Sequence, residues 1–271
     1  MLLCALIGAV IGIVTVPMWI PALIYRPASL HPAEPAAWGL PAARVVSIPS
    51  GRSDHLSGWW LPPPKPDAPV VLIVHGRSGN ISTRAPIASR LSADGFGVLL
   101  FDFRGYGLST GRPSERALTE DAEAAYDWLR RQGVAPRRIV VLGQSLGDAP
   151  AARLGASRPI VALALVSPFT SLPEALADRL PWIPVRLIPW RQNRFGVEPS
   201  VRSLHAPVLF VVSPEDGLVP YANSRRLAKA ARDGRWLEVQ GQKHDGLLAA
   251  ASQTGRLSPA LEALLADAPM Q

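Results

Sequence analysis

Cysteine is almost absent from this chain of 271 residues, because Cys4 is the only one. No intrachain disulfide can therefore form, so cysteine pairing does not indicate whether the protein lies in an oxidising or a reducing compartment. Charged side chains are also few, at 18% of residues. Lysine is rare, so the formal net charge of +7 rests on arginine. That charge suits a surface near an anionic membrane. Charge alone would also allow nucleic-acid binding, but no recognition motif supports it, and we expect no nucleic-acid partner.

No charged side chain occurs in residues 1–25. A membrane-spanning helix needs about twenty apolar residues, so this stretch is long enough. It lacks a basic leading region and an obvious cleavage site, which favours an uncleaved anchor over a signal peptide. Arg26, Arg44 and Arg52 follow the stretch and no basic residue precedes it. This asymmetry favours a cytoplasmic domain, although large domains often cross regardless of charge. The sequence predicts a single-pass membrane protein with one domain over residues 26–271.

The rest of the chain has the pattern of a large α/β domain. Apolar residues make up 48% of the chain, enough for a sizeable core. Short apolar runs alternate with helical patterns, which predicts a mostly parallel sheet of about eight strands with helices on both faces. Strands near residues 44–48 and 56–61 are close enough for an antiparallel start. Helices are expected around residues 84–93, 115–132, 149–156, 222–232 and 258–266.

The most informative motif is Gly143-Gln144-Ser145-Leu146-Gly147. An apolar run rich in β-branched residues precedes it, and an alanine-rich stretch that can begin a helix follows. A strand, this motif and a helix form the pattern of a nucleophile elbow, a sharp turn that lifts a serine hydroxyl clear of the backbone. The flanking glycines are needed because side chains there would collide with the neighbouring strand and helix. We therefore expect Ser145 to be a nucleophile.

A serine nucleophile needs a histidine as base and a carboxylate that orients the histidine. Only His205 and His244 lie downstream of Ser145. His205 comes just before a strand-like run, whereas His244 follows one and lies in a loop, where catalytic groups are usually carried. Glu215 and Asp216 stand together after another strand-like run. The order strand, Asp, helix, strand, His favours Asp216, and a solvated turn residue is the alternative for either carboxylate.

An oxyanion hole of two backbone N–H groups is the third requirement. One donor should be Leu146, the residue after the nucleophile, and the other should lie in a loop after an earlier strand. Residues 70–74 form a fully apolar strand that ends in His75 and Gly76. Gly76 lets the backbone turn, so that the amide of Arg77 can point into the site. We expect His75 to orient this loop without acting as a catalyst.

These residues resemble the alpha/beta-hydrolase superfamily, and most closely its membrane-anchored serine hydrolases of the fission-yeast bud-emergence type. The resemblance extends over about residues 23–248. It implies a triad of Ser145, Asp216 and His244, and it needs no metal or organic cofactor. Its landmarks in chain order are residues 23–27, 75–80, 101–109, 111–115, the elbow, 167–172, Asp216 with Val219-Pro220, and His244.

The resemblance also implies Arg77 and Leu146 as oxyanion donors and a structural role for Asp102. Three positions depart from the family pattern. Asp148 stands where glycine is usual, three residues after the nucleophile, and a partly buried acid there would need a partner or a raised pKa. Ser213 and Lys243 replace two further glycines. None of these changes removes a catalytic group, but they keep a non-catalytic, hydrolase-like binding protein as an alternative.

A Pro- and Trp-rich insertion separates the strand-like residues 160–166 and 207–212. Its stretch 180–190 is too apolar for an ordinary surface loop. In the resembled family this position carries the lid, so a small cap is expected at about residues 170–205, shaping an apolar acyl pocket. Core packing over the sheet edge is the alternative.

The sequence thus predicts a serine hydrolase that cleaves a carboxylic ester or thioester with a hydrophobic acyl group. The substrate would be a small-molecule or lipid-like acyl compound, and the reaction would pass through an acyl-enzyme. A serine peptidase or aminopeptidase of the same fold is the alternative. An acidic pocket that binds a substrate amine would support it, with Asp148 as the candidate if it faces the site. Nothing in the sequence indicates the oligomeric state.

Overall fold

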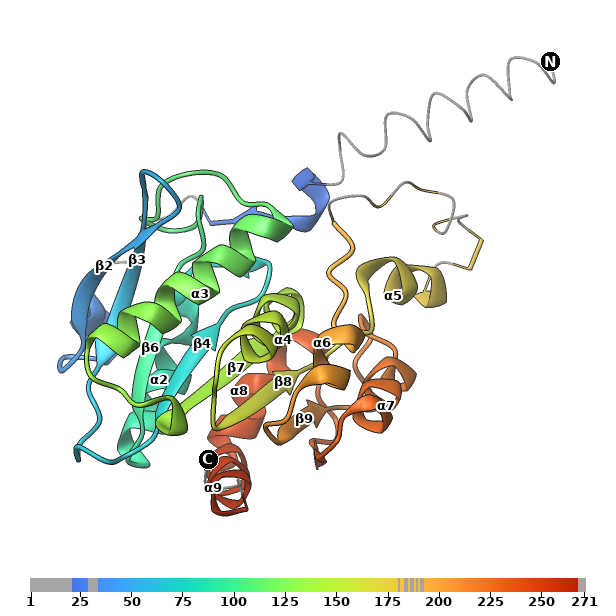
Figure 1. Cartoon of the computed structure of the whole chain (residues 1–271). Helices are drawn as coiled ribbons and strands as arrows, with labels where there is room; N and C mark the ends of the chain where they lie inside the picture. Colours follow the sequence, from blue (N-terminus) through green and yellow to red (C-terminus); the bar gives the residue numbers. More distant parts are fainter. Residues whose placement is uncertain are drawn as a thin grey trace.

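The computed structural model describes residues 21–28, 34–179, 181–182, 185, 188, 190 and 193–267 (Figure 1). Most of the predicted anchor, residues 1–20, lies outside the described residues, as do several positions of the apolar stretch 180–190. Within the described ranges, no helix combines the length and the apolar character needed to cross a membrane. The single-pass anchor therefore stays a prediction.

One mostly parallel sheet of eight strands forms the centre of the described part, which confirms the predicted fold class. Its strand order is β10-β9-β8-β7-β4-β6-β3-β2. The pairs β2–β3 and β3–β6 are antiparallel and the other pairs are parallel, so the predicted antiparallel start is confirmed. The strands are β2 (Arg44–Ser50), β3 (Asp54–Leu61), β4 (Val70–Val74), β6 (Gly97–Phe101), β7 (Ile139–Gln144), β8 (Ala162–Val166), β9 (Val208–Val212) and β10 (Gly234–Glu238).

Helices cover both faces of the sheet (Figure 1), which explains why β4, β7, β8 and β9 are buried apolar runs. Within β4, Leu72 and Val74 face one helix layer and Ile73 faces the other, as strand alternation requires. The first layer holds α3 (Glu115–Arg131), α4 (Asp148–Ser157), α6 (Glu198–Ser203) and α7 (Tyr221–Ala230). The second layer holds α2 (Ala85–Ala93), α8 (Leu247–Gln253) and α9 (Leu257–Ala266).

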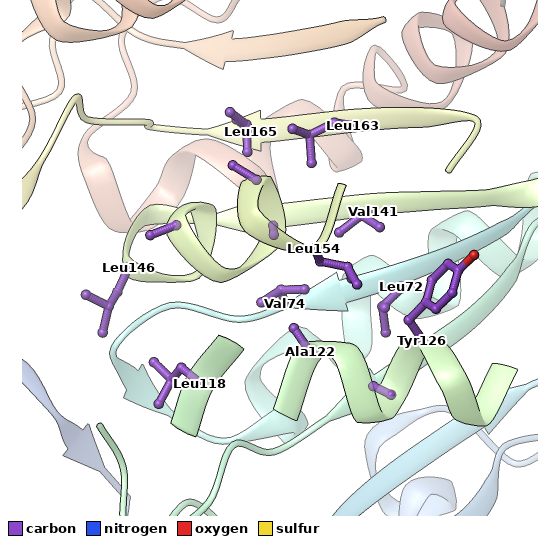
Figure 2. Packing of buried hydrophobic residues seen from close by; sticks show 14 of the residues in the cluster. Leu72, Val74, Leu118, Ala122, Tyr126, Val141, Leu146, Leu154, Leu163 and Leu165 are labelled. Carbon is purple, nitrogen blue, oxygen red and sulfur yellow. The ribbon is translucent and has the colours of Figure 1, made fainter. Parts of the chain in front are cut away.

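The packing between α3, α4 and the sheet fixes the start of α4, where the elbow lies. Figure 2 shows Leu118 and Ala122 of α3 and Leu154 of α4 lying against strand residues such as Leu72 and Val141. All five side chains are fully buried. A close-packed interior of this kind holds the elements around it rigidly.

The insertion between β8 and β9 begins with α5 (Leu172–Arg179) and returns through residues 193–197 to α6. Its base is closed by two backbone hydrogen bonds, from Leu172 N–H to the Arg194 carbonyl at 2.8 Å and from Val197 N–H to the Thr170 carbonyl at 2.9 Å. The returning residues Phe195 and Val197 are fully buried in the core. The insertion therefore contributes to the core, and its helix α5 lies over the site described below.

The first described residues, 21–28, pack on the domain. The short strands β1 (Arg26–Pro27) and β5 (Ser78–Gly79) pair in parallel beside the loop that follows β4. Tyr25 Oη donates to Asn193 Oδ1 at 3.0 Å and so reaches the returning limb of the insertion. Residues on both sides of the predicted boundary between residues 25 and 26 therefore contact the domain.

Candidate active site

Ser145 stands where β7 turns into α4, in the conformation expected of a nucleophile elbow. Its φ is 53°, in the left-handed region that residues other than glycine rarely adopt. A Cβ added at Gly143 would lie 2.8 Å from the Asp148 Cα, and one at Gly147 would lie 2.2 Å from the Val74 carbonyl oxygen. Helix α4 and strand β4 therefore leave room for glycine alone at these positions, for the reason that the sequence suggested.

The structure brings the three predicted triad residues together. His244 Nε2 lies 2.8 Å from Ser145 Oγ. On the other side of the ring, Nδ1 lies 2.9 Å from Asp216 Oδ2 and 3.1 Å from Oδ1. When Nδ1–H donates to the carboxylate, Nε2 is free to accept the serine proton. The arrangement can therefore activate the Ser145 hydroxyl.

Hydrogen bonds keep Asp216 ionised. Burial acts to raise the pKa of its carboxyl, but the hydrogen bond from His244 and the N–H groups of Val219 and Leu218 hold that pKa below its ordinary value. Both N–H groups donate to Oδ1 at 2.9 Å. A charged, oriented carboxylate is what an imidazolium partner needs.

His205 and Glu215, the alternatives to His244 and Asp216, do not join the triad. His205 lines a separate hollow between the end of α4 and the end of α6, next to the amino end of β9. Glu215 Oε2 accepts hydrogen bonds from Ser213 Oγ and from Gly241 N–H, both at 2.9 Å. Glu215 thereby joins the acid loop to the loop that precedes His244, while Asp216 receives the imidazole.

The two predicted oxyanion donors lie on the serine's side of the site. Leu146 and Arg77 line the same pocket as Ser145. Gly76 lies beside the elbow, since a Cβ added there would be 3.7 Å from Ser145 Cβ and 3.2 Å from the Gln144 carbonyl oxygen. The loop after β4 therefore passes close enough to the nucleophile to supply a second N–H group.

His75 orients the peptide that carries the Arg77 amide. Its Nδ1 lies 2.7 Å from the Gly76 carbonyl oxygen, and its Nε2 accepts from Phe103 N–H at 3.3 Å. Because the Gly76 carbonyl and the Arg77 N–H belong to one planar peptide, the contact fixes the direction of that N–H. Burial, with a smaller contribution from Arg84, lowers the pKa of His75 to about 3. The neutral ring then donates through Nδ1, in agreement with the expected orienting role.

Asp102 lies behind the oxyanion loop. Its Oδ1 accepts from Ile81 N–H at 2.8 Å, and burial raises the pKa of its carboxyl to about 7. A Cβ added at Gly107 would lie 2.0 Å from Asp102 Oδ2, so the glycine packs directly on the carboxyl. These contacts fit the structural role that the family resemblance implies.

Arg84 is a further charged group near the site that the sequence analysis missed. Its Nε donates to Gln144 Oε1 at 3.0 Å, which joins it to the elbow. Burial lowers the pKa of its guanidinium, while Asp102 and Asp245 oppose that shift. The sequence offered no signal, because an arginine at the start of a helical pattern is usually a solvated residue.

Asp148, the acid that replaces a family glycine, does not line the pocket beside Ser145. Its side chain is fully buried, and Oδ1 accepts from Val166 N–H at 3.3 Å. The nearby Ser145 backbone amide favours the charged form of this carboxyl, and Oδ2 has no hydrogen-bond partner among the residues described. Burial raises the pKa of Asp148 well above its ordinary value. The acid is therefore placed to support the elbow and not to bind a substrate amine.

The other two departures fit their positions. The Ser213 hydroxyl donates to Glu215, a contact that glycine could not make. Lys243 is exposed and has extended backbone angles, φ −78° and ψ 162°, which any residue adopts. Neither side chain displaces a triad member.

An apolar pocket opens beside Ser145, built from distant parts of the chain. Ile24 comes from the N-terminal segment, Phe169 from the loop after β8 and Leu176 from α5, while Val219 follows the acid. Arg77 and Arg179 are the charged side chains in its described lining. The sequence analysis expected an insertion at about residues 170–205 to shape this pocket, and α5 lies in that range. It did not place Ile24, Phe169 or Val219 there, because no local pattern shows that these positions meet.

A serine, an aspartate and a histidine in this chain order, at one edge of a mostly parallel sheet, define the alpha/beta hydrolases. The family described as serine aminopeptidase, S33, matches residues 65–196. An uncharacterized protein of Mycobacterium tuberculosis is 42% identical over 226 residues, which cover 82% of this chain and 79% of that protein. The chain belongs to the alpha/beta-hydrolase superfamily, as the sequence resemblance indicated.

Two further comparisons describe its neighbours. Lysophosphatidylserine lipase ABHD12 of Danio rerio is 32% identical over 187 residues, covering 62% of this chain and 49% of the lipase, so the chain spans about half of that protein. An esterase of Pyrococcus furiosus has a similar fold, with a TM-score of 0.71 at 19% identity over 90% of this chain and 96% of the esterase.

Proposed function

We propose that this protein is a serine hydrolase that cleaves a carboxylic ester or thioester with a hydrophobic acyl group. The observation that carries the proposal is the hydrogen-bonded series Ser145, His244 and Asp216 beside an apolar pocket. The names of the lipase and the esterase among its neighbours support the same reaction class.

In the proposed mechanism, Ser145 Oγ attacks the carbonyl carbon while His244 Nε2 takes its proton. Asp216 stabilises the resulting imidazolium. The N–H groups of Leu146 and Arg77 hold the oxyanion. His244 then returns the proton to the leaving alkoxide or thiolate, which departs and leaves an acyl-enzyme. A water molecule, deprotonated by His244, attacks the acyl-enzyme and releases the acid and free Ser145.

The pocket favours an acyl substrate over a peptide amine. Its described lining contains apolar side chains and two arginines but no carboxylate that would bind an ammonium group. The family described as serine aminopeptidase, S33, keeps a peptidase as the second candidate. Asp148 gives that candidate no support, since its carboxyl lies between α4 and the sheet.

Labelling with a fluorophosphonate probe tests the proposal. Full-length protein in detergent should react through Ser145, so Ser145→Ala should abolish labelling. His244→Ala should slow labelling by a hundredfold or more, on the order of the effect of a general base. Ser203→Ala and His205→Ala change the same residue types in the hollow between α4 and α6 and should label like wild type.

Folded wild-type protein that fails to label, or a Ser145→Ala variant that still labels, would reject the activated serine and leave the hydrolase-like binding protein. Once labelling is established, the reaction classes can be ranked by their cleavage rates. The substrates compared are an ester, a thioester and an aminoacyl amide with the same acyl group. Faster cleavage of the amide would favour the peptidase.

A further inference from the structure

Two arginines line the otherwise apolar pocket. Arg77 follows Gly76 in the loop after β4, and Arg179 is the last residue of α5 in the insertion. Arg77 is partly buried and Arg179 is exposed. The Arg77 Nη1 group reaches only the Leu23 carbonyl oxygen at 3.4 Å. Among the described residues, neither guanidinium has a carboxylate partner. The pocket therefore has positive charge that no acid of the described chain neutralises.

Helix α5 separates its charges by sign. Leu172, Ala175, Leu176 and Arg179, spaced as one helix face, line the pocket. The acids Glu174 and Asp178 line a different hollow against α7. There Glu174 lies 3.6 Å from Arg226, and Asp178 accepts from Asn223 at 3.0 Å. The charge that α5 presents to the pocket is therefore positive only.

The position of the charges fits an amphiphilic ligand. Leu23 and Leu218, which also line the pocket, are 61% and 37% exposed and so form its rim. Leu146 and Phe169, in the same lining, are buried. An acyl chain would occupy the buried apolar part, while the exposed guanidinium of Arg179 stays at the rim. Guanidinium groups bind phosphate and carboxylate in a bidentate fashion.

We propose that the pocket selects acyl esters whose alcohol part carries a phosphate or carboxylate, and that Arg179, with Arg77, binds that anionic group. This inference rests on the proposed hydrolase function of the same site. Arg179 would thus determine specificity without taking part in the bond-making steps.

A matched set of esters tests the inference. A monoacylglycerol, the acyl ester of glycerate and the acyl ester of glycerol phosphate share one acyl chain and differ in the terminal hydroxyl, carboxylate or phosphate. The readout is kcat/KM for fatty-acid release, given as the ratio of anionic to neutral ester. Arg179→Met should lower this ratio about tenfold, the low end for a hydrogen bond to a charged group. Arg179→Glu should lower it further, and Arg179→Lys should retain most of it.

Arg225→Met is the matched control. Arg225 is exposed and lies over the Tyr221 ring in another hollow, so its loss changes the net charge equally but should leave the ratio unchanged. A ratio that Arg179→Met and Arg179→Glu both leave unaltered would overturn the anion site. The larger of the two anionic ratios identifies phosphate or carboxylate as the preferred group.

The test separates this inference from the function on which it rests. Hydrolysis of the monoacylglycerol that disappears in Ser145→Ala, together with a ratio independent of Arg179, would reject the anion site alone. Absence of hydrolysis of all three esters by folded wild type would reject both. Thermal unfolding of each variant checks that the exposed substitutions leave the fold intact.

Discussion

The buried carboxyl of Asp148 links the catalytic elbow to the stability of the fold. Burial raises its pKa in the folded state, whereas the unfolded chain has the ordinary value near 3.8. Above about pH 4, unfolding therefore releases a proton that the folded state still holds. The folded state consequently loses stability as pH rises from the unfolded pKa toward the folded one. At neutral pH, Asp148 destabilises the domain.

Asp148→Asn should remove this penalty. The amide keeps the oxygen that accepts from Val166 N–H and carries no titratable proton. We expect the variant to be more stable than wild type at pH 7 by about 1 kcal/mol or more, the free energy linked to one pKa unit. Urea unfolding at pH 4, 5.5 and 7 measures the difference.

The gain should be smallest at pH 4 and should grow toward pH 7. Asp67→Asn, at an exposed position, is the control and should give a flat, near-zero difference. A gain at Asp148 that does not change with pH would show that its carboxyl is already ionised in the folded state.

At the scale of single residues, the sequence predicted those residues whose role depends on their neighbours in the chain. Ser145 could be found because its glycines lie within two positions of it. Glu215 and Asp216 could only be ranked, because adjacent carboxylates in one loop differ in what they face, and that depends on the fold. Ile24 was beyond prediction for the same reason, because it lies far along the chain from the serine that it approaches. For Arg179, the sequence indicated only the insertion that carries it.

Among the elements, the N-terminal strand β1 supports the oxyanion loop. The Arg77 carbonyl accepts from Arg26 N–H at 3.0 Å and from Tyr106 Oη at 2.8 Å. Two donors from separate segments thus fix the peptide that follows the predicted oxyanion donor. Displacement of a positioned group by about 1 Å can slow an enzyme by about a hundredfold.

Arg26→Pro tests this support, because proline lacks the N–H that Arg77 accepts. We expect kcat for a soluble ester to fall about tenfold, because a loosened oxyanion loop would hold its N–H donor less well in place. Arg26→Ala keeps the N–H and is the control, so its kcat should stay near that of wild type. Equal kcat values for the two variants would show that β1 pairing does not affect the site.

The longer helices were predictable, whereas the short ones were not. Helix α3 spans 17 residues and is preceded by the N-cap Ser114, whose side chain accepts from Ala117 N–H, so both its period and its cap appear in the sequence. Helices α5, α6 and α8 have 8, 6 and 7 residues and had no counterpart among the expected elements. Helices of about two turns carry too little periodicity to be distinguished from a loop.

For the whole molecule, the predicted anchor would place the proposed acyl hydrolase at a membrane. Full-length protein should remain in the membrane pellet after alkaline carbonate extraction, and N-terminal sequencing should find Met1 or its immediate neighbour. Ile11→Arg with Val14→Arg should release it, since each arginine near the centre of a span costs about 2.5–3.5 kcal/mol. A mature chain that begins far downstream of residue 1 would instead establish the signal-peptide alternative.

Leu23 and Ile24, which precede β1 in the chain, line the pocket. A protease that cut the chain just before Arg26 would set free a domain with its triad complete but with one wall of the acyl pocket left behind. Such a shed form would still react with small esters and would hold long acyl chains poorly. Proteolytic release would therefore act as a change of substrate range, and not merely as a change of location.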